Sequence, residues 1–297
     1  MSKSKKIGYG VLGVYVLTFI VVAIVFGATR RDNDEFLPQN DFKLDTWFSL
    51  GPIDFNKGVM YVIIAAILTV VTMLYIANRM AAKPNKVQTL VEVLYTTMRD
   101  NITRGNMDDK MAAKWFPFIG ALFLFIWFSN LIGYLPLPTN TEHTFDVLGV
   151  SVPSFALYAA TANLSVPLVL AFVVFVAYNL EGIRAKGLVG YLKSLVPAGI
   201  TGFAAVPLFI LEFVSNFMRL ISLSVRLFAN ILAGHLIILF MSGGLAVLLG
   251  LEVLGVFLLP FGVVLFMFEL GLVATLQAFI FATLSAIYLG GAVAEDH

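Results

Sequence analysis

The stretch from Ala204 to Met241 constrains this chain most, because it is almost wholly apolar and far longer than one membrane crossing. As one helix it would be about 57 Å long at ~1.5 Å per residue, whereas the hydrocarbon core of a bilayer is ~30 Å thick. No Gly or Pro interrupts it between Leu208 and Ala233. We therefore predict a single helix tilted strongly, by roughly 60°, from the membrane normal.

Polar side chains form a stripe along this predicted helix. At ~100° per residue, the members of the stripe share one face; they are Glu212, Ser215, Arg219, Ser222, Arg226 and Asn230. His235 follows nine residues after Arg226 and points the opposite way. A charge at membrane depth costs roughly 2.5–3.5 kcal/mol on insertion scales and usually marks an ion or substrate path. The stripe therefore indicates transport of something charged.

The composition of the chain is that of an integral membrane protein. It is 60% hydrophobic and 12% charged, against about 25% charged residues in soluble domains. We predict an all-α integral membrane protein with about six hydrophobic helices and no cofactor. The absence of Cys and the spacing of the three His argue against a metal site. No phosphate loop of the GxxxxGK[ST] type occurs, so ATP hydrolysis is not expected on this chain. No basic, aromatic-rich patch suggests a nucleic-acid partner.

The predicted helices follow the apolar runs. The six spans are Ile7–Ala28, Gly58–Asn78, Trp115–Leu135, about Ala160–Leu180, the long stretch already described, and about Leu251–Leu289. The last two form a long, strongly tilted hairpin within residues 200–290, with its turn at Gly243-Gly244. Apolar residues at helical spacing between Asn85 and Arg104 predict one amphipathic interfacial helix, or alternatively a short soluble helix that packs on a partner.

The N-terminal segment has two interpretations. Residues 1–57 hold either a retained membrane helix or a signal peptide, followed by an external loop, whereas residues 58–297 form a single membrane channel domain. The apolar run is longer than the ~7–15 residues of a signal-peptide core, which favours a retained helix. The basic MSKSKK start does not resemble a transit peptide, so a bacterial plasma membrane is favoured over an organelle.

Loop charge predicts the orientation. The loop from Arg79 to Lys114 holds seven basic residues and should be cytoplasmic, and the loop from Thr139 to Tyr158 has no Lys or Arg and should lie outside. The C-terminus then lies in the cytoplasm. With this orientation, Glu212 and His235 lie on opposite sides of Arg226. A desolvated Arg keeps its proton, so titratable groups on either side of it suit two aqueous half-paths separated by a fixed positive charge.

Three segments resemble one known family. SLSVRLFANILAGHL closely resembles the signature of subunit a of F-type ATP synthases, TLQAFIFATLSAIYL resembles its final helix, and FPFIGALFLFIWFSNLIGYLP resembles an earlier span. The similarity covers roughly Phe116 to the C-terminus. It implies a stator subunit in the lipid bilayer that works with a rotating c-ring and with peripheral-stalk b subunits, and that is not itself catalytic.

The resemblance also implies roles for single residues. Arg226 matches the essential arginine that meets the proton-carrying carboxylate of the c-ring, with Asn230 and Gln277 as its polar neighbours and Tyr288 as a family tyrosine. Glu212 matches an acid of the inner half-channel, where Arg219 and Ser222 also fall. His235 and Glu269 match the outer half-channel, but Glu269 stands eight residues before Gln277, where the family pattern predicts seven.

Other interpretations remain open at this stage. A secondary transporter or a standalone cation channel is the alternative function, although no internal repeat is visible. A structural scaffold would leave Arg226 unexplained. Arg219 and Glu212 can be merely an ion pair, His235 a packing residue and Glu269 an unrelated acid. Asn230 and Gln277 can be hydrogen-bonding residues between helices.

Overall fold

The computed structural model describes residues 10, 12–18, 20–21, 43–44, 46–51, 53–78, 85–147, 150–196, 200, 205–244, 246 and 252–294. Among these residues, five helices are long and apolar enough to cross a membrane: Lys57–Asn78, Asp109–Gly133, Ser165–Ser194, Ala205–Ser242 and Leu254–Val293. The prediction of an all-helical membrane protein is confirmed. The first predicted span, Ile7–Ala28, lies mostly outside the described residues, and its described positions are helical.

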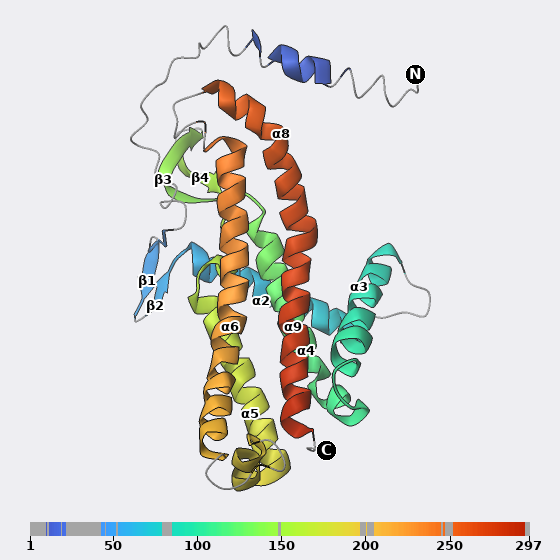
Figure 1. Cartoon of the computed structure of the whole chain (residues 1–297). Coiled ribbons are helices and arrows are strands. Elements are labelled where there is room, and N and C mark those ends of the chain that lie inside the picture. The colour runs from blue at the N-terminus through green and yellow to red at the C-terminus, as the bar shows by residue number, and fades with distance from the viewer. Residues whose placement is uncertain are drawn as a thin grey trace. The chain divides into compact units, whose positions relative to one another are not determined.

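The chain divides into two compact units, which are described separately. One comprises Met1–Asp45, Pro136–Tyr158 and Ala233–Leu272, and the other comprises Thr46–Leu135, Ala159–Leu232 and Val273–His297. The long stretch forms α6 (Ala205–Leu239), a single helix as predicted, and continues into the wider turn η5 (Phe240–Gly244). The returning segment consists of α8 (Glu252–Phe268), the π-type turn η6 (Glu269–Val273) and α9 (Ala274–Val293) (Figure 1).

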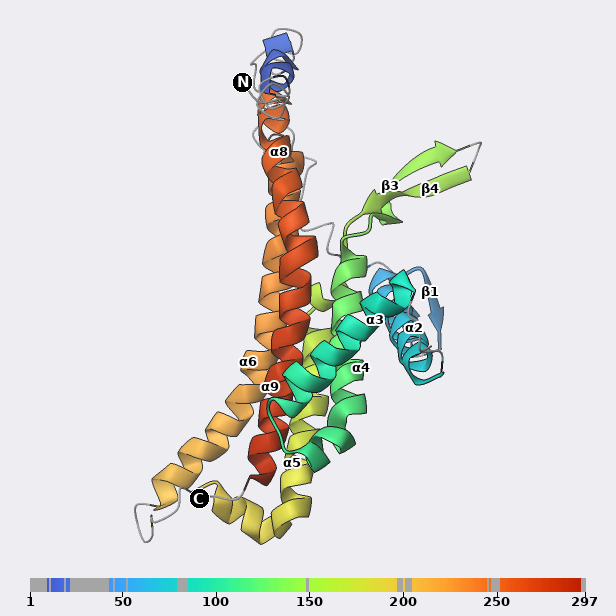
Figure 2. The same cartoon turned by 90° about the vertical axis from the view of Figure 1, so that its right-hand side faces the viewer.

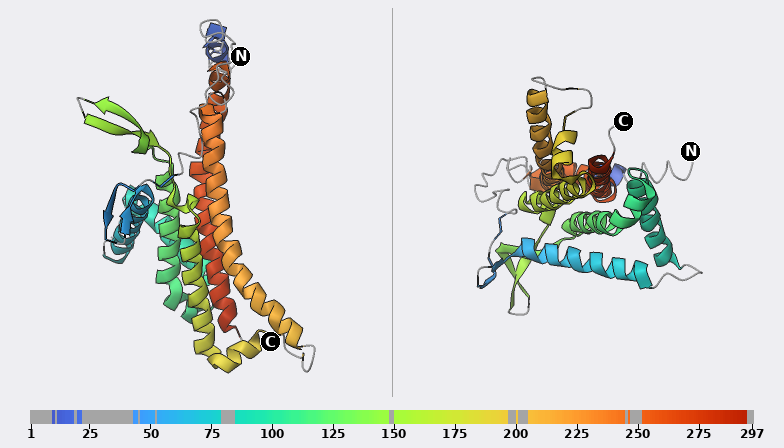
Figure 3. Two further views of the ribbon diagram at one scale, coloured as in Figure 1. Left: turned by 90° about the vertical axis from the view of Figure 1, so that its left-hand side faces the viewer. Right: turned by 90° about the horizontal axis from the view of Figure 1, so that it is seen from below.

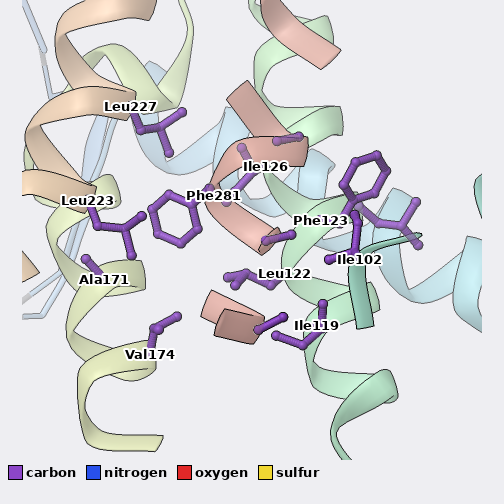
Figure 4. Close-up of a cluster of buried hydrophobic side chains, with 14 of the residues drawn as sticks. Ile102, Ile119, Leu122, Phe123, Ile126, Ala171, Val174, Leu223, Leu227 and Phe281 are labelled. Carbon is purple, nitrogen blue, oxygen red and sulfur yellow. The ribbon is translucent and has the colours of Figure 1, made fainter. Parts of the chain in front are cut away.

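The second unit has its apolar core where four membrane helices and η2 (Thr97–Arg104) meet. Helix α4 (Asp109–Gly133) contributes Ile119, Leu122, Phe123 and Ile126, which recur at helical spacing and are all buried. Helix α5 (Ser165–Ser194) contributes Ala171 and Val174, α6 contributes Leu223 and Leu227, α9 contributes Phe281, and η2 contributes Ile102 (Figure 4). This cluster packs the first part of α6 against α9.

Helix α2 (Lys57–Asn78) crosses the other helices of the second unit. Figure 3 (right) shows α2 along its length in a view that looks nearly down the axes of α4, α5 and α9. Only a narrow stripe of α2 is buried, including Tyr61 and Ala65, and its remaining apolar side chains are partly or fully exposed. An apolar helix that exposes most of its surface suits a lipid environment.

The predicted amphipathic helix is present as α3 (Lys86–Thr96) followed by η2. It begins at the N-cap Asn85, whose side chain accepts a hydrogen bond from the backbone N–H of Gln88 at 2.8 Å. Its apolar residues are divided between two surfaces. Val91 and Met98 are buried, η2 packs on α4 (Figure 2), and Val87, Leu90 and Val93 are exposed.

Two β-hairpins lie where the sequence predicted loops. Strands β1 (Phe48–Leu50) and β2 (Ile53–Phe55) pair around Gly51, which adopts a φ of 64°. In the other unit, β3 (Leu137–Val147) and β4 (Val150–Ala156) pair in antiparallel register from Leu137 opposite Ala156 to Val147 opposite Val150 (Figure 2). Prolines at 138 and 153 and an irregular register obscure the alternation that would identify strands in sequence.

Candidate functional site

An exposed face of α6 carries the central arginine. Ser222, Arg226 and Asn230 lie one turn apart and are all exposed, beside the exposed apolar side chains of Ile221 and Val225. Among the described residues, the guanidinium of Arg226 has one hydrogen bond, a long one of 3.5 Å to the Ser222 hydroxyl. An exposed guanidinium with only this long hydrogen bond can therefore take an anionic partner from outside this chain.

A polar pocket of about 340 Å³ opens where α5, α6 and α9 meet. Its walls include Tyr178, Tyr191, Glu212, Asn216, Arg219 and Tyr288. Arg219 donates a hydrogen bond to Glu212 at 3.1 Å, and its guanidinium lies 5.5 Å from the centroid of the Tyr288 ring. The structure thus brings together three residues that the sequence analysis selected. Glu212 and Arg219 line this pocket, whereas Arg226 lies on the exposed face.

Three wall residues, Tyr178, Tyr191 and Asn216, were missed by the sequence analysis, and so was Asn179, which is hydrogen-bonded to two of them. We call Tyr178, Asn179, Tyr191 and Asn216 the Asn216 network. The Tyr178 hydroxyl donates to Asn216 Oδ1 at 2.6 Å, and Asn216 Nδ2 donates to Asn179 Oδ1 at 2.9 Å. The Tyr191 hydroxyl also donates to Asn179 Oδ1, at 2.7 Å. One available signal was the position of Asn216 one helical turn after Glu212.

A break in α5 brings Tyr191 into this network. Gly187 has φ 72° and ψ 161°, a conformation that only glycine adopts readily, and no atom lies near the position of its missing side chain. Beyond the break, the Tyr191 ring packs on Gly182, where a Cβ atom would lie 2.5 Å from Tyr191 Cε2. The two glycines therefore allow the chain to fold back and close one side of the pocket.

Gln277 lies in the buried face of α9, with 6% of its surface exposed. It is not hydrogen-bonded to Arg226 in the described part of the chain, although the neighbouring Phe281 packs with Leu227 in the core (Figure 4). Helix α4 fixes this end of α9. Asn130 donates to the carbonyl oxygen of Ala274 at 3.2 Å, and Trp127 donates to the Thr275 hydroxyl at 3.0 Å.

The other unit holds the second pair of titratable residues. His235 and Glu269 are buried, with 3% and 9% of their surfaces exposed. The Glu269 carboxylate packs directly on Gly234, where a Cβ atom would lie 2.6 Å from Glu269 Cδ. Glu269 therefore sits against the residue that precedes His235. No group of three or more His, Cys, Asp or Glu suitable for a metal occurs in the residues described here.

Glu269 is the first residue of the π-type turn η6. The turn runs from Glu269 to Val273 and thus lies between Glu269 and Gln277. A π-type turn holds one residue more than an α-helical turn and is frequent at functional sites. This extra residue equals the difference between the observed spacing of eight and the seven that the family resemblance predicts.

Comparison with known proteins identifies similar chains. A sequence model of the family described as ATP synthase A chain matches residues 59–290. ATP synthase subunit a of Rhodopseudomonas palustris (strain BisA53) is 32% identical over 270 residues, which cover 88% of this chain and 99% of that protein. ATP synthase subunit a of Rubrobacter xylanophilus is 36% identical over 242 residues, which cover 80% of this chain and 83% of that protein.

Proposed function

Because the chain belongs to the ATP synthase A chain family, we propose that it is the stator subunit a of a rotary F-type ATP synthase. In this proposal it conducts protons through two aqueous half-channels to and from a c-ring, and it couples proton flow to rotation and ATP synthesis. Residues 58–297 act as one channel domain. The chain itself is not catalytic, because it performs no chemistry on ATP.

The observation that carries this proposal is the exposed Arg226. Its guanidinium has one long hydrogen bond, to Ser222, among the described residues, and it lies on a helix face beside the exposed apolar side chains of Ile221 and Val225. A carboxylate on the c-ring would meet this charge, which favours the ionised form of the carboxylate and so promotes release of its proton. Because the arginine keeps its own proton, it also blocks direct leakage between the half-channels. Asn230, Ser222 and Gln277 shape the surroundings of Arg226.

The half-channels correspond to two groups of residues. Protons reach the ring from the outer side past His235 and Glu269, which are both buried and whose side chains can bind and release a proton. They leave through the pocket lined by Glu212, Arg219 and Tyr288. The neutral, protonated site of the ring travels through lipid between these two exchanges, since a neutral carboxyl costs far less to place in hydrocarbon than a carboxylate.

The crossing of α2 over the other helices of its unit supports a strongly tilted hairpin. α2 is 22 residues long, close to the ~20 that span a bilayer upright. If α2 stands upright, the parts of α6 and α9 that belong to its unit lie well away from the membrane normal. A tilted helix presents Ser222, Arg226 and Asn230 along the path of successive ring carboxylates rather than at a single depth.

The partners in this proposal are the c-ring, the peripheral-stalk b subunits and the lipid bilayer. The bacterial relatives and the five apolar helices suit a multi-pass protein of a bacterial plasma membrane. The distribution of basic loop residues suits a cytoplasmic C-terminus.

The decisive experiment is ATP-driven acidification of inverted membrane vesicles that carry Arg226→Ala. We expect acidification to vanish, because the ring carboxylate loses the charge that promotes its ionisation. Native gels of the same membranes should show normal amounts of assembled complex, since the Arg226 side chain is exposed.

Val225→Ala is the matched control, because it shortens the neighbouring exposed side chain and leaves the charge in place. It should acidify the vesicles at close to the wild-type rate. Near wild-type acidification by Arg226→Ala in a fully assembled complex would remove the central argument for this function.

A further inference from the structure

Asn216 links α6 to α5 by side-chain hydrogen bonds. Between Ala205 and Asn230, and within the described residues, it is the only side chain of α6 that is hydrogen-bonded to another helix. The rest of this part of α6 is held by apolar contacts such as those of Leu223 and Leu227, together with the stacking of Arg219 on Tyr288. Apolar contacts are non-directional, whereas hydrogen bonds require a defined geometry.

The Asn216 network has one consistent pattern of donors and acceptors. Asn216 accepts from Tyr178 and donates to Asn179, so both ends of its amide are occupied by α5. Asn179 Oδ1 takes a second hydrogen bond from Tyr191, while its Nδ2 donates to the carbonyl oxygen of Phe175 at 2.7 Å. Since Asn179 is anchored to the backbone of α5, the network ties Asn216 to a fixed point.

The network lies between two functional groups of α6. Glu212 precedes Asn216 by four residues and Arg219 follows it by three, so all three line the same pocket. A helix turns as one body over such short distances, so any rotation at Asn216 would move Glu212 and Arg219 out of the pocket wall. It would also re-aim Arg226, which lies on the same helix.

We propose that Asn216 is the positioning residue of the inner half-channel, because its two hydrogen bonds to α5 fix the rotation of α6 about its own axis. It holds Glu212 and Arg219 in the pocket wall and Arg226 toward the outside. It does not carry protons itself, since a side-chain amide acts as neither an acid nor a base at working pH. This inference rests on the proposed function only for its consequence on proton flow, whereas the rotation of α6 can be measured independently.

The first test measures rotation by thiol labelling in membranes that contain the assembled complex. The chain has no Cys, so a single Ser224→Cys substitution gives one reactive site. Ser224 and Ser285 are both buried and each donates to a carbonyl of its own helix, α6 or α9. In the Asn216→Leu background we expect the Ser224→Cys reporter to gain reactivity with a small water-soluble maleimide. The matching Ser285→Cys reporter should stay protected.

The second test measures acidification per assembled complex in the same membranes. Asn216→Leu should lower it by on the order of tenfold, the factor that corresponds to the loss of one to two hydrogen bonds. Tyr178→Phe and Tyr191→Phe keep the shape of the ring and each remove one hydroxyl donor, so smaller decreases are expected. Met218→Leu, an exposed neighbour of similar volume, should leave both measurements unchanged.

Each outcome decides between explanations. Unchanged labelling and acidification in Asn216→Leu would overturn the positioning role, and so would an equal gain at both reporters, which indicates general loosening. If Asn216→Leu prevents assembly, Tyr178→Phe provides the same comparison, and protection of its Ser224→Cys reporter at the wild-type level would refute the inference. A third outcome separates the two proposals. If the Ser224→Cys reporter gains reactivity in Asn216→Leu but Arg226→Ala still acidifies the vesicles, then Asn216 does position α6 and only the proposed function is wrong.

Discussion

At the scale of single residues, a substitution at Gly234 tests whether proton transport depends on the position of the Glu269 carboxylate. A methyl group at 234 would occupy the place of the Glu269 carboxylate. We expect Gly234→Ala to push that carboxylate away and to lower ATP-driven acidification by at least about tenfold, because misplacing a functional group by ~1 Å can cost more than that. The complex should still assemble, since Ala favours helix over Gly by about 1 kcal/mol.

Gly271→Ala is the control for this change. Gly271 lies in the adjoining turn η6, and no atom lies within 4 Å of the position that its Cβ would take. Acidification should be preserved in this variant. Equal losses in Gly271→Ala and Gly234→Ala would show that the turn, rather than the Glu269 contact, is sensitive to a methyl group.

The residues of the predicted stripe were found in the sequence, but their division between two surfaces was not. Spacing at ~100° per residue places Glu212, Arg219 and Arg226 within about 40° of one another, in one narrow stripe along the helix. Whether each member of that stripe faces a pocket or the outside depends on where α5 and α9 pack. Asn216 was missed for the same reason, because its partners Tyr178 and Asn179 lie on another helix and no pattern within α6 reveals them.

At the scale of elements, the fold-back of α5 depends on Gly187. Its φ of 72° with ψ 161° disfavours any side chain, although there is open space around it. Gly187→Ala should therefore lower the thermal stability of the complex in detergent by the equivalent of about 1–3 kcal/mol of local strain. Gly190→Ala, three residues later in ordinary helix, should raise stability slightly. Equal melting temperatures for both variants would contradict a strained backbone at Gly187.

Helices were easier to predict than the other elements, for a physical reason. Apolar runs longer than a bilayer is thick leave few alternatives to helix, so α2, α4, α6 and α9 were predicted near their observed positions. The break at Gly187 changes the backbone conformation of one residue and the wide turn η6 involves five, and both leave the apolar pattern of the sequence intact. The β3–β4 hairpin was missed because its strands do not alternate regularly.

At the scale of the whole molecule, the orientation in the membrane can be tested through the hairpin of β3 and β4. The segment Thr139–Tyr158, which includes most of this hairpin, has no Lys or Arg and should face outward. A Thr141→Cys variant should react with a membrane-impermeant thiol reagent in right-side-out vesicles and be protected in sealed inverted vesicles. Lys110→Cys, in the first turn of α4 and within the basic segment Arg79–Lys114, should show the opposite pattern. Labelling of both variants from the same side would refute the predicted topology.

The contact between Gly234 and Glu269 also has a consequence for how these two positions vary among related sequences. The carboxylate fills the space that a larger residue at 234 would need, so the two positions should vary together during evolution. Glu269→Asp shortens the side chain by one methylene and should make room for a methyl group. The double variant Gly234→Ala/Glu269→Asp should therefore pump better than Gly234→Ala alone. Lineages that replace this glycine should be found to have altered the acid as well.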